Sequence, residues 1–455
     1  MAQQDNVGKK EYFAYGIGNF ASQLSWTMVS TYLSIFYTDV FGLAPSAIAV
    51  LFLVAKIWDG CNDPMMGAIM QRTNTKWGRF RPYIVIGSIF LVAFTILTFT
   101  VPGFSSRGKL IYAYVTYIGL GMSYTMTNVP YQGMPAVMTR DPHKINRLNG
   151  AQVMGMMVGM TVLNLVTLPL VNYFNGIKKN AGYQYTAIVF AVIALLLFWY
   201  CAKTCKEVVV VEKEYQPPIK ESLKYLFTSK NMIMVILYDC LVIMGAMGRI
   251  AIAVYFYLYV ANTGALTSIY MMLPMFMGII LTPFAPILTD KFGKRNVTLA
   301  TLGIQSLGLL MMVIGPNTNL VYLFICTAIY GIGALKEPSL PGMLVDALDE
   351  VDLKTGVRPD GIAFSLLGLG NKIGSAIGSA VGVAVIGWFG YTGGENITAH
   401  IQSGITISVN VFPVVVFVLS AIPVFFYNLN EEKMQKIRQE LDERNEKRAQ
   451  KAQAE

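Results

Sequence analysis

Two aspartates, Asp59 and Asp63, lie in a segment, residues 51–70, that otherwise has the composition of a membrane helix. A carboxylate in the hydrocarbon of a bilayer is costly, and such residues mark ion or substrate pathways. Because the two aspartates are four residues apart, their side chains lie on one face of a helix. Stacked carboxylate oxygens suit a hard cation such as Na⁺, so the segment predicts a cation site.

Lys56 lies about one turn from Asp59. An ion pair between them is the alternative role for that carboxylate, and the two roles are compatible because a nearby lysine can tune a cation site. Two neighbouring carboxylates also favour uptake of a proton. The coupling ion is therefore left open between Na⁺ and H⁺, and no other cofactor is expected.

The composition is that of a membrane protein. The chain has 455 residues, of which 54% are hydrophobic and 13% charged, whereas soluble domains carry roughly 25% charged residues. The net charge of +9 comes from Lys and Arg in loops and the tail, without a basic strip interleaved with aromatics, so nucleic-acid binding is not expected. The only histidines, His143 and His400, fall in predicted loops, and no nucleophile–base pair lies in the apolar segments, so an enzyme is not expected either.

Apolar stretches long enough to cross a bilayer occur about twelve times. They lie roughly at 12–38, 44–70, 81–101, 110–136, 148–171, 184–203, 231–260, 265–288, 297–315, 320–345, 362–389 and 405–427. Basic residues concentrate in the loops after the second, fourth, sixth and eighth spans and in the tail. By the positive-inside rule these loops and both termini are cytoplasmic.

The longest polar connection lies near the middle and divides the spans into two groups of six. The loops TNTKWGRFRP and TDKFGKRN, after the second and eighth spans, indicate an internal repeat. Twelve helices in two six-helix bundles are typical of the major facilitator fold, an all-α membrane fold. The expected divisions are 1–203 for the first bundle, with the cation site; 204–230 for the linker; 231–427 for the second bundle; and 428–455 for a charged tail. That tail is expected to be a solvated helix, with a partner-binding helix as the alternative.

Several motifs resemble one family of transporters. KIWDGCNDPMMG and QRTNTKWGRFRPYIVIG in and after the second span, with YTDVFGL at 37–43, resemble the glycoside–pentoside–hexuronide:cation symporter family. YGIGNF, YIGLGMSYTMTNVPY and GIAFSLLGLGNKIGSAIG follow in family order, so the resemblance covers nearly the whole chain. It implies cation-coupled symport of a sugar or glycoside by alternating access. It also implies a multi-pass protein in the bilayer of the cell membrane, working as a monomer.

The resemblance also implies which residues bind the cation. Asp63 matches the family's central cation carboxylate, and Asp59 matches a contributor to the same site. Asn62 and Thr125 match residues close by, and their oxygens suit a hard cation.

The sugar half of the family's site has diverged in this chain. Gln23 and Asn128 stand where the family's melibiose carriers have aspartates. Val153 replaces an arginine, and Gln132 replaces a tryptophan, while the lysine of the eleventh span is kept as Lys372. The changes favour a neutral or anionic substrate and look closer to the family's glucuronide carriers.

Further candidates for the substrate site come from residue type. Trp26, Tyr124 and Tyr131 are aromatic side chains on which a sugar ring can stack. Lys336 and Glu337 in the tenth span are about 100° apart on a helix, so one of them is expected to face the cavity.

A uronide carboxylate would pair with Lys372 or Lys336. The alternative for Lys372 is an ion pair with Asp59 or Asp63 across the two bundles, released when the cation binds. A second function remains open, a major facilitator transporter of a lipid or other amphiphile.

Overall fold

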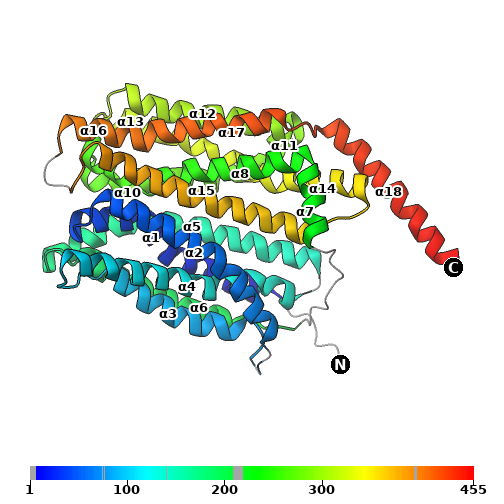
Figure 1. The fold of residues 1–455 in the computed structure, drawn as a ribbon, viewed down its shortest axis with the longest axis horizontal. Coiled ribbons are helices and arrows are strands. Elements are labelled where there is room, and N and C mark those ends of the chain that lie inside the picture. Colours follow the sequence, from blue (N-terminus) through cyan, green and yellow to red (C-terminus); the bar gives the residue numbers. More distant parts are fainter. Residues whose placement is uncertain are drawn as a thin grey trace.

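The computed structural model describes residues 7–73, 75, 77–139, 141–208, 219–393 and 397–454. These residues are almost entirely helical, and their only β pairing is an isolated bridge between Thr75 and Gly78. The long helices lie side by side along the long axis of the molecule (Figure 1). The all-α prediction is confirmed.

The first half of the chain forms one group of six long helices, in the lower half of Figure 1. They are α1 (Lys9–Ile35), α2 (Pro45–Arg72), α3 (Arg81–Thr98), α4 (Ser106–Met138), α5 (Pro142–Ile177) and α6 (Gly182–Thr204). A π-helical turn, η1 (Phe36–Val40), continues α1.

The second half forms the upper group in Figure 1, after the short helix α7 (Ile219–Thr228). Its spans are α8 (Lys230–Ile250) with α9 (Ala253–Tyr255) and η2 (Phe256–Val260); η3 (Gly264–Leu266), α10 (Thr267–Leu281), η4 (Thr282–Phe284) and α11 (Ala285–Phe292); α12 (Lys294–Ile314); α13 (Leu320–Gly331), η5 (Ile332–Lys336) and α14 (Ser339–Thr355); α15 (Asp360–Trp388); and α16 (Ala399–Thr406), η6 (Ile407–Val411) and α17 (Phe412–Phe426). The tail helix α18 (Glu431–Ala454) follows.

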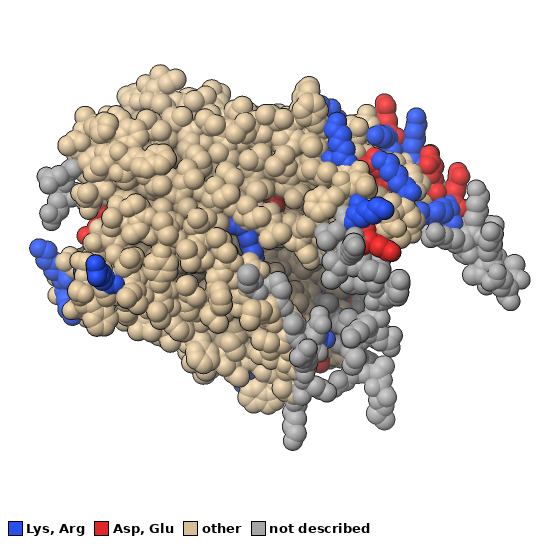
Figure 2. Space-filling model, viewed as in Figure 1, with Lys and Arg blue, Asp and Glu red and all other residues tan. Residues whose placement is uncertain are grey.

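Nine segments of the described chain are long and apolar enough to cross a membrane. Three further long helices of the first half, α1, α2 and α4, are not among these nine, and they carry most of the candidate polar residues. Together they give the twelve crossings expected. Outward-facing apolar side chains such as Ile111 and Val115, 65% and 61% exposed, suit a lipid environment. Figure 2 shows few charged side chains along the middle of the visible face.

α1 begins, and α18 leaves the bundle, at the same end of the molecule, which we call the terminal end (Figure 1). η1 and η2 therefore lie at the opposite end. The side of the membrane that each end faces, and the exact domain boundaries, stay predictions.

The tenth span departs from the predicted unbroken helix. Residues 332–336 are 3₁₀-helical and Glu337 lies in a turn before Pro338. Proline lacks a backbone N–H and clashes with the preceding helical turn, so it favours such a break. The expected 100° between Lys336 and Glu337 assumed an unbroken α-helix, whereas a 3₁₀ segment turns about 120° per residue.

Two pairs of helices form the main contact between the halves. α15 packs against α2, and α10 packs against α5. The eleventh span thus meets the second and the eighth meets the fifth, which is the exchange expected of two repeats related by a twofold axis. The candidate aspartates of α2 consequently face α15.

The tail helix is not free in solvent along its whole surface. α18 packs on α14, with Met434, Ile437 and Leu441 of α18 buried. Arg438 pairs with Asp346 at 3.1 Å, and ion pairs of this kind continue along the same face. The expected solvated helix is therefore solvated only in part, because one apolar stripe of α18 packs on α14 of the same chain.

Candidate functional site

A cavity lies between the halves at the middle of the candidate helices. Its walls come from α1, α2 and α4 on one side and from α8 and α15 on the other. It is lined by Trp26, Lys56, Asp59, Asp63, Gly121, Tyr124, Thr125, Ile243, Met247, Asn371, Lys372 and Ser375. Six predicted site residues therefore share one space.

Asp63 lies at the centre of this cavity. Its Oδ1 accepts a hydrogen bond from the Thr125 hydroxyl at 2.8 Å, and its Oδ2 forms an ion pair with Lys372. The Lys372 ammonium also donates to the backbone carbonyl of Asp59 at 2.9 Å. The alternative of an ion pair across the two bundles is therefore present in this conformation.

Asp59 has its own partner one turn away on α2. Its Oδ2 lies 3.4 Å from the Lys56 Nζ, as the spacing allowed. Its other oxygen lies so close to α4 that a Cβ added at Gly121 would be 2.6 Å from Oδ1. The absence of a side chain at Gly121 thus lets this carboxylate lie between α2 and α4.

Asn62 is 8% exposed, and its amide Nδ2 has no hydrogen-bond partner among the described residues. A buried amide donor without a partner costs free energy. Asn62 is next to Asp63 in sequence but does not line the cavity in this conformation.

The substrate candidates divide into two groups. Trp26 and Tyr124 line the cavity and stack on each other, with ring centroids 5.0 Å apart. Lys56 lies 4.2 Å above the Trp26 ring, so the aromatic pair adjoins the cation site. Lys372, described above, is the third candidate in the cavity.

Gln23 and Tyr131 lie outside this cavity. The Gln23 amide is satisfied within α1, since it donates to Asn19 at 3.3 Å and accepts from Thr27 at 3.1 Å. Tyr131 is fully buried and stacks on Tyr15 at 4.6 Å. In this conformation the Gln23 amide therefore bonds within its own helix, whereas Tyr131 packs α4 against α1.

The other four candidates also lie outside it. Asn128 is half-buried and Gln132 is exposed. Lys336 is 4% exposed and pairs with Glu337 at 3.3 Å while donating to Gln305 at 3.0 Å. Both candidate lysines for a uronide thus have acidic partners.

Two further charged residues of α8 are buried. Asp239 accepts a hydrogen bond from Asn371 at 2.5 Å, and Arg249 is 2% exposed. Neither forms an ion pair with another described residue. In the part of the chain that the structure describes, no oppositely charged side chain on a neighbouring helix pairs with either of them.

A cluster at the opposite end from the termini was not predicted. Asp39 accepts hydrogen bonds from Thr38 at 2.7 Å, Tyr391 at 2.6 Å and Tyr259, and Thr38 lies 2.9 Å from the Tyr255 hydroxyl. We call these five residues the Asp39 cluster. It joins the two halves of the molecule. The acidic residue of YTDVFGL at a span end was the available signal, but its tyrosine partners are more than 200 residues away.

The fold is that of a membrane transporter. The structure aligns with the crystal structure of a D-xylose–proton symporter at a TM-score of 0.67, covering 92% of this chain and 98% of the other, with 15% sequence identity. At that identity the likeness shows the major facilitator fold alone, and it confirms the fold predicted from the spans.

Sequence comparison gives the family. A model described as "MFS/sugar transport protein" matches residues 14–431. The chain is 32% identical to the isoprimeverose transporter of Lactiplantibacillus pentosus, covering 95% of this chain and 91% of the relative. It is 27% identical to a glucuronide carrier protein homolog of Escherichia coli (strain K12), covering 94% of each. The chain belongs to the MFS/sugar transport protein family, the glycoside–pentoside–hexuronide:cation symporters, and is an integral protein of the cell membrane.

Proposed function

We propose that this protein is a secondary active transporter that couples movement of a sugar or glycoside to a cation, Na⁺ or H⁺. The observation that carries the proposal is the Lys372 ammonium, which contacts Asp63 and the Asp59 carbonyl from the other half of the molecule. A positive charge is thus held among oxygen atoms in the wall of a cavity between two repeats. Family membership supports transport, not catalysis, as the activity.

The cation competes with the lysine. Hard cations take oxygen ligands, and Asp63, Thr125 and the Asp59 carbonyl offer them around the position of the ammonium. Asn62 can offer its amide oxygen as a further ligand if α2 turns slightly, since its Nδ2 has no partner among the described residues to fix the amide. A cation bound there displaces Lys372 into the cavity, where it becomes available to a substrate.

This exchange couples the two ligands. If the cation tightens sugar binding by releasing Lys372, the sugar must tighten cation binding by the same factor. The two halves then move around the cavity to change its access. The Asp39 cluster holds the halves together at the opposite end, so its hydrogen bonds must break when that end opens.

The sugar ring has an aromatic surface available at Trp26, beside Tyr124. The names of the relatives, an isoprimeverose transporter and a glucuronide carrier homolog, support a glycoside as the substrate class. A uronide held by Lys336 gains no support, because that lysine is paired with Glu337 and lies away from the cavity. The working unit is proposed to be a monomer, and nothing favours a lipid substrate.

The test is a thermal-shift screen on the purified protein. Glycosides are compared with Na⁺, with choline in its place, and at two pH values. We expect a ligand that stabilises the protein only when the cation is present, since binding raises the melting temperature by mass action. Asp63→Asn should abolish this cation dependence, while Asp290→Asn, in α11, should keep it. A cation-dependent shift that survives in Asp63→Asn would show that the assigned cation site is wrong.

A further inference from the structure

Arg249 is a buried positive charge that the proposed cation mechanism does not use. It lies on the membrane-spanning helix α8 and is 2% exposed. A charged side chain at this depth is costly unless it is paired or functional. Within the described residues Arg249 forms no ion pair, so its charge is not balanced by a neighbouring carboxylate there.

The two sides of the guanidinium differ in their partners. Nη1 donates to the Val409 carbonyl at 3.0 Å and to the Asn410 Oδ1 at 2.8 Å, which fixes that side to η6. Nη2 has weaker partners, the Tyr257 hydroxyl at 3.2 Å and the Met312 sulfur at 3.8 Å. Nε has no hydrogen bond to a described residue. The Nε–Nη2 side therefore keeps capacity for a stronger acceptor.

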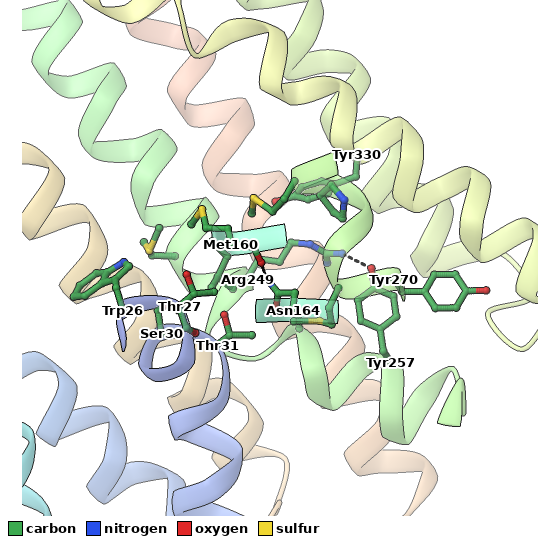
Figure 3. A pocket seen from close by; sticks show the side chains of 16 residues that line it. Trp26, Thr27, Ser30, Thr31, Met160, Asn164, Arg249, Tyr257, Tyr270 and Tyr330 are labelled. Atoms are coloured by element: carbon green, nitrogen blue, oxygen red, sulfur yellow. Dashed lines mark hydrogen bonds between the residues drawn. The ribbon is translucent and has the colours of Figure 1, made fainter. Parts of the chain in front are cut away.

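The side chain lies in the wall of a second cavity, shown in Figure 3. The Tyr330 ring lies beside the guanidinium, whose Cζ is 4.5 Å from the ring centroid. Thr27 and Asn164, from α1 and α5, line the facing half of the same cavity. Because both halves of the molecule contribute, this space belongs to the region that changes access during transport.

Trp26 connects this cavity to the cation site, because it lines both of them. Met247, two residues before Arg249 on α8, also lines both. A sugar ring that stacks on Trp26 therefore borders both the cation-site cavity and the Arg249 cavity.

A purely structural role for Arg249 would explain the hydrogen bonds of its Nη1, but it would not explain why the buried side chain carries a positive charge. A neutral glutamine could donate to the carbonyl and amide oxygens of η6 without burying a cation. The planar guanidinium instead matches a carboxylate, which it binds through two parallel hydrogen bonds. A carboxylate on the ligand would both neutralise the charge and use the Nε–Nη2 side.

We propose that Arg249 recognises a carboxylate on the transported sugar, so that the substrate is an acidic glycoside. The inference rests on the proposed function and adds a residue and a substrate class to it. It moves acid recognition from the lysines expected from the sequence to an arginine on α8.

Matched pairs of ligands test the proposal on the full-length protein in detergent with Na⁺. The probes are methyl glucoside and methyl glucuronide, and methyl galactoside and methyl galacturonide, which differ in each pair only at C6. We expect at least one acid to bind more tightly than its neutral counterpart. Arg249→Gln should weaken binding of that acid about 10- to 100-fold, the loss expected for charge-assisted hydrogen bonds, and remove the preference. Arg295→Gln, at the terminal end, is the matched control and should keep it.

A second variant covers the case in which Arg249→Gln does not fold. Asn410→Asp is nearly isosteric, and the Asn410 Nδ2 that it removes has no partner among the described residues. The new carboxylate would neutralise the guanidinium within the protein, so acid binding should fall although Arg249 is present. Unchanged acid binding in this variant would overturn the proposal.

The outcomes separate this inference from the proposed function. If neutral members bind with cation dependence and every acid binds equally or more weakly, the inference fails while sugar symport stands. If neither member of any pair binds under any cation condition, the proposed function fails and the Arg249 inference fails with it.

Discussion

At Asp63, two positive charges compete for the same oxygen atoms. Lys372 fills the position in this conformation, with a carboxylate and a backbone carbonyl as partners. Its side chain is 27% exposed, so the ion pair is only partly desolvated and can exchange with a cation from the cavity. Asp59, held by Lys56, keeps its charge directed toward α4 and contributes a backbone oxygen to the exchange.

Removing the competing lysine should strengthen cation binding and weaken coupling. In Lys372→Gln, Na⁺ no longer displaces an ammonium, so its apparent affinity without sugar should rise about tenfold, an order-of-magnitude estimate for one partly exposed pair. The dependence of sugar binding on Na⁺ should fall at the same time. Isothermal titration with Na⁺, with and without the sugar, measures both.

The control for that change is Lys294→Gln. It removes another lysine–aspartate pair, in which the Lys294 Nζ lies 2.6 Å from the Asp346 Oδ2. Neither residue lines the cavity. An Na⁺ affinity that is equal in the wild type and in Lys372→Gln would contradict the competition.

At the scale of elements, α15 connects the cation site to the second half of the molecule. Lys372 of α15 reaches across to α2, while two glycines of the same helix contact the backbone of α8. A Cβ at Gly374 or Gly378 would collide with the carbonyl oxygens of Cys240 or Met244. α8 and α15 therefore pack closely enough to move together when Lys372 is released.

An added methyl group should show this close packing directly. Gly378→Ala should destabilise the protein by about 1–3 kcal/mol, because the backbones of α8 and α15 must separate. Gly368→Ala, in the same helix but with no atom near the added Cβ, should leave stability unchanged or slightly raised. Melting temperatures of the two variants in one detergent test the difference; equal values would show that the α8–α15 contact is not tight.

At the scale of the whole molecule, hydrogen bonds join the two halves at one end of their interface. The Asp39 cluster joins η1 of the first half to η2 and the loop after α15 of the second half. The Tyr391 and Tyr255 rings pack edge to face at 5.2 Å, which adds apolar contact to the hydrogen bonds. The equilibrium between access states therefore depends on this cluster as well as on ligand binding at the centre.

Loss of the carboxylate should open that end more often. Asp39→Ala removes two tyrosine hydrogen bonds to a charged acceptor. The population of molecules that are open at the end carrying the Asp39 cluster should therefore rise by about tenfold or more. A cysteine at Ser30, in the wall of the Arg249 cavity, reports this as faster labelling by an impermeant maleimide added from that side. Tyr173→Phe, at an exposed tyrosine, serves as the control. Labelling unchanged by Asp39→Ala would show that the cluster does not hold the end closed.

The site residues were predicted from residue spacing within single helices, from the family resemblance and from residue type. Asp59 and Asp63 share a helix face because of their spacing alone, and Thr125 was added by the family resemblance. Gln23 and Tyr131 were assigned to the sugar on residue type. The structure instead satisfies Gln23 within α1 and packs Tyr131 against Tyr15 of α1, since burial and partners depend on how helices rotate about their axes. Lys336 and Glu337 were assigned to the cavity from their place in the tenth span, but in this conformation they pair with each other and line a different part of the molecule.

By itself the sequence determined the class of the protein, the number of membrane crossings and the helix face with the paired aspartates. These follow from composition and periodicity along a single segment. Only the tertiary structure decided that Lys372 occupies the Asp63 site, that Arg249 lies without an acidic partner among the described residues in a cavity between the halves, and that Asp39 meets tyrosines more than 200 residues away. Such contacts depend on which helices pack together, and that arrangement is set by the chain as a whole.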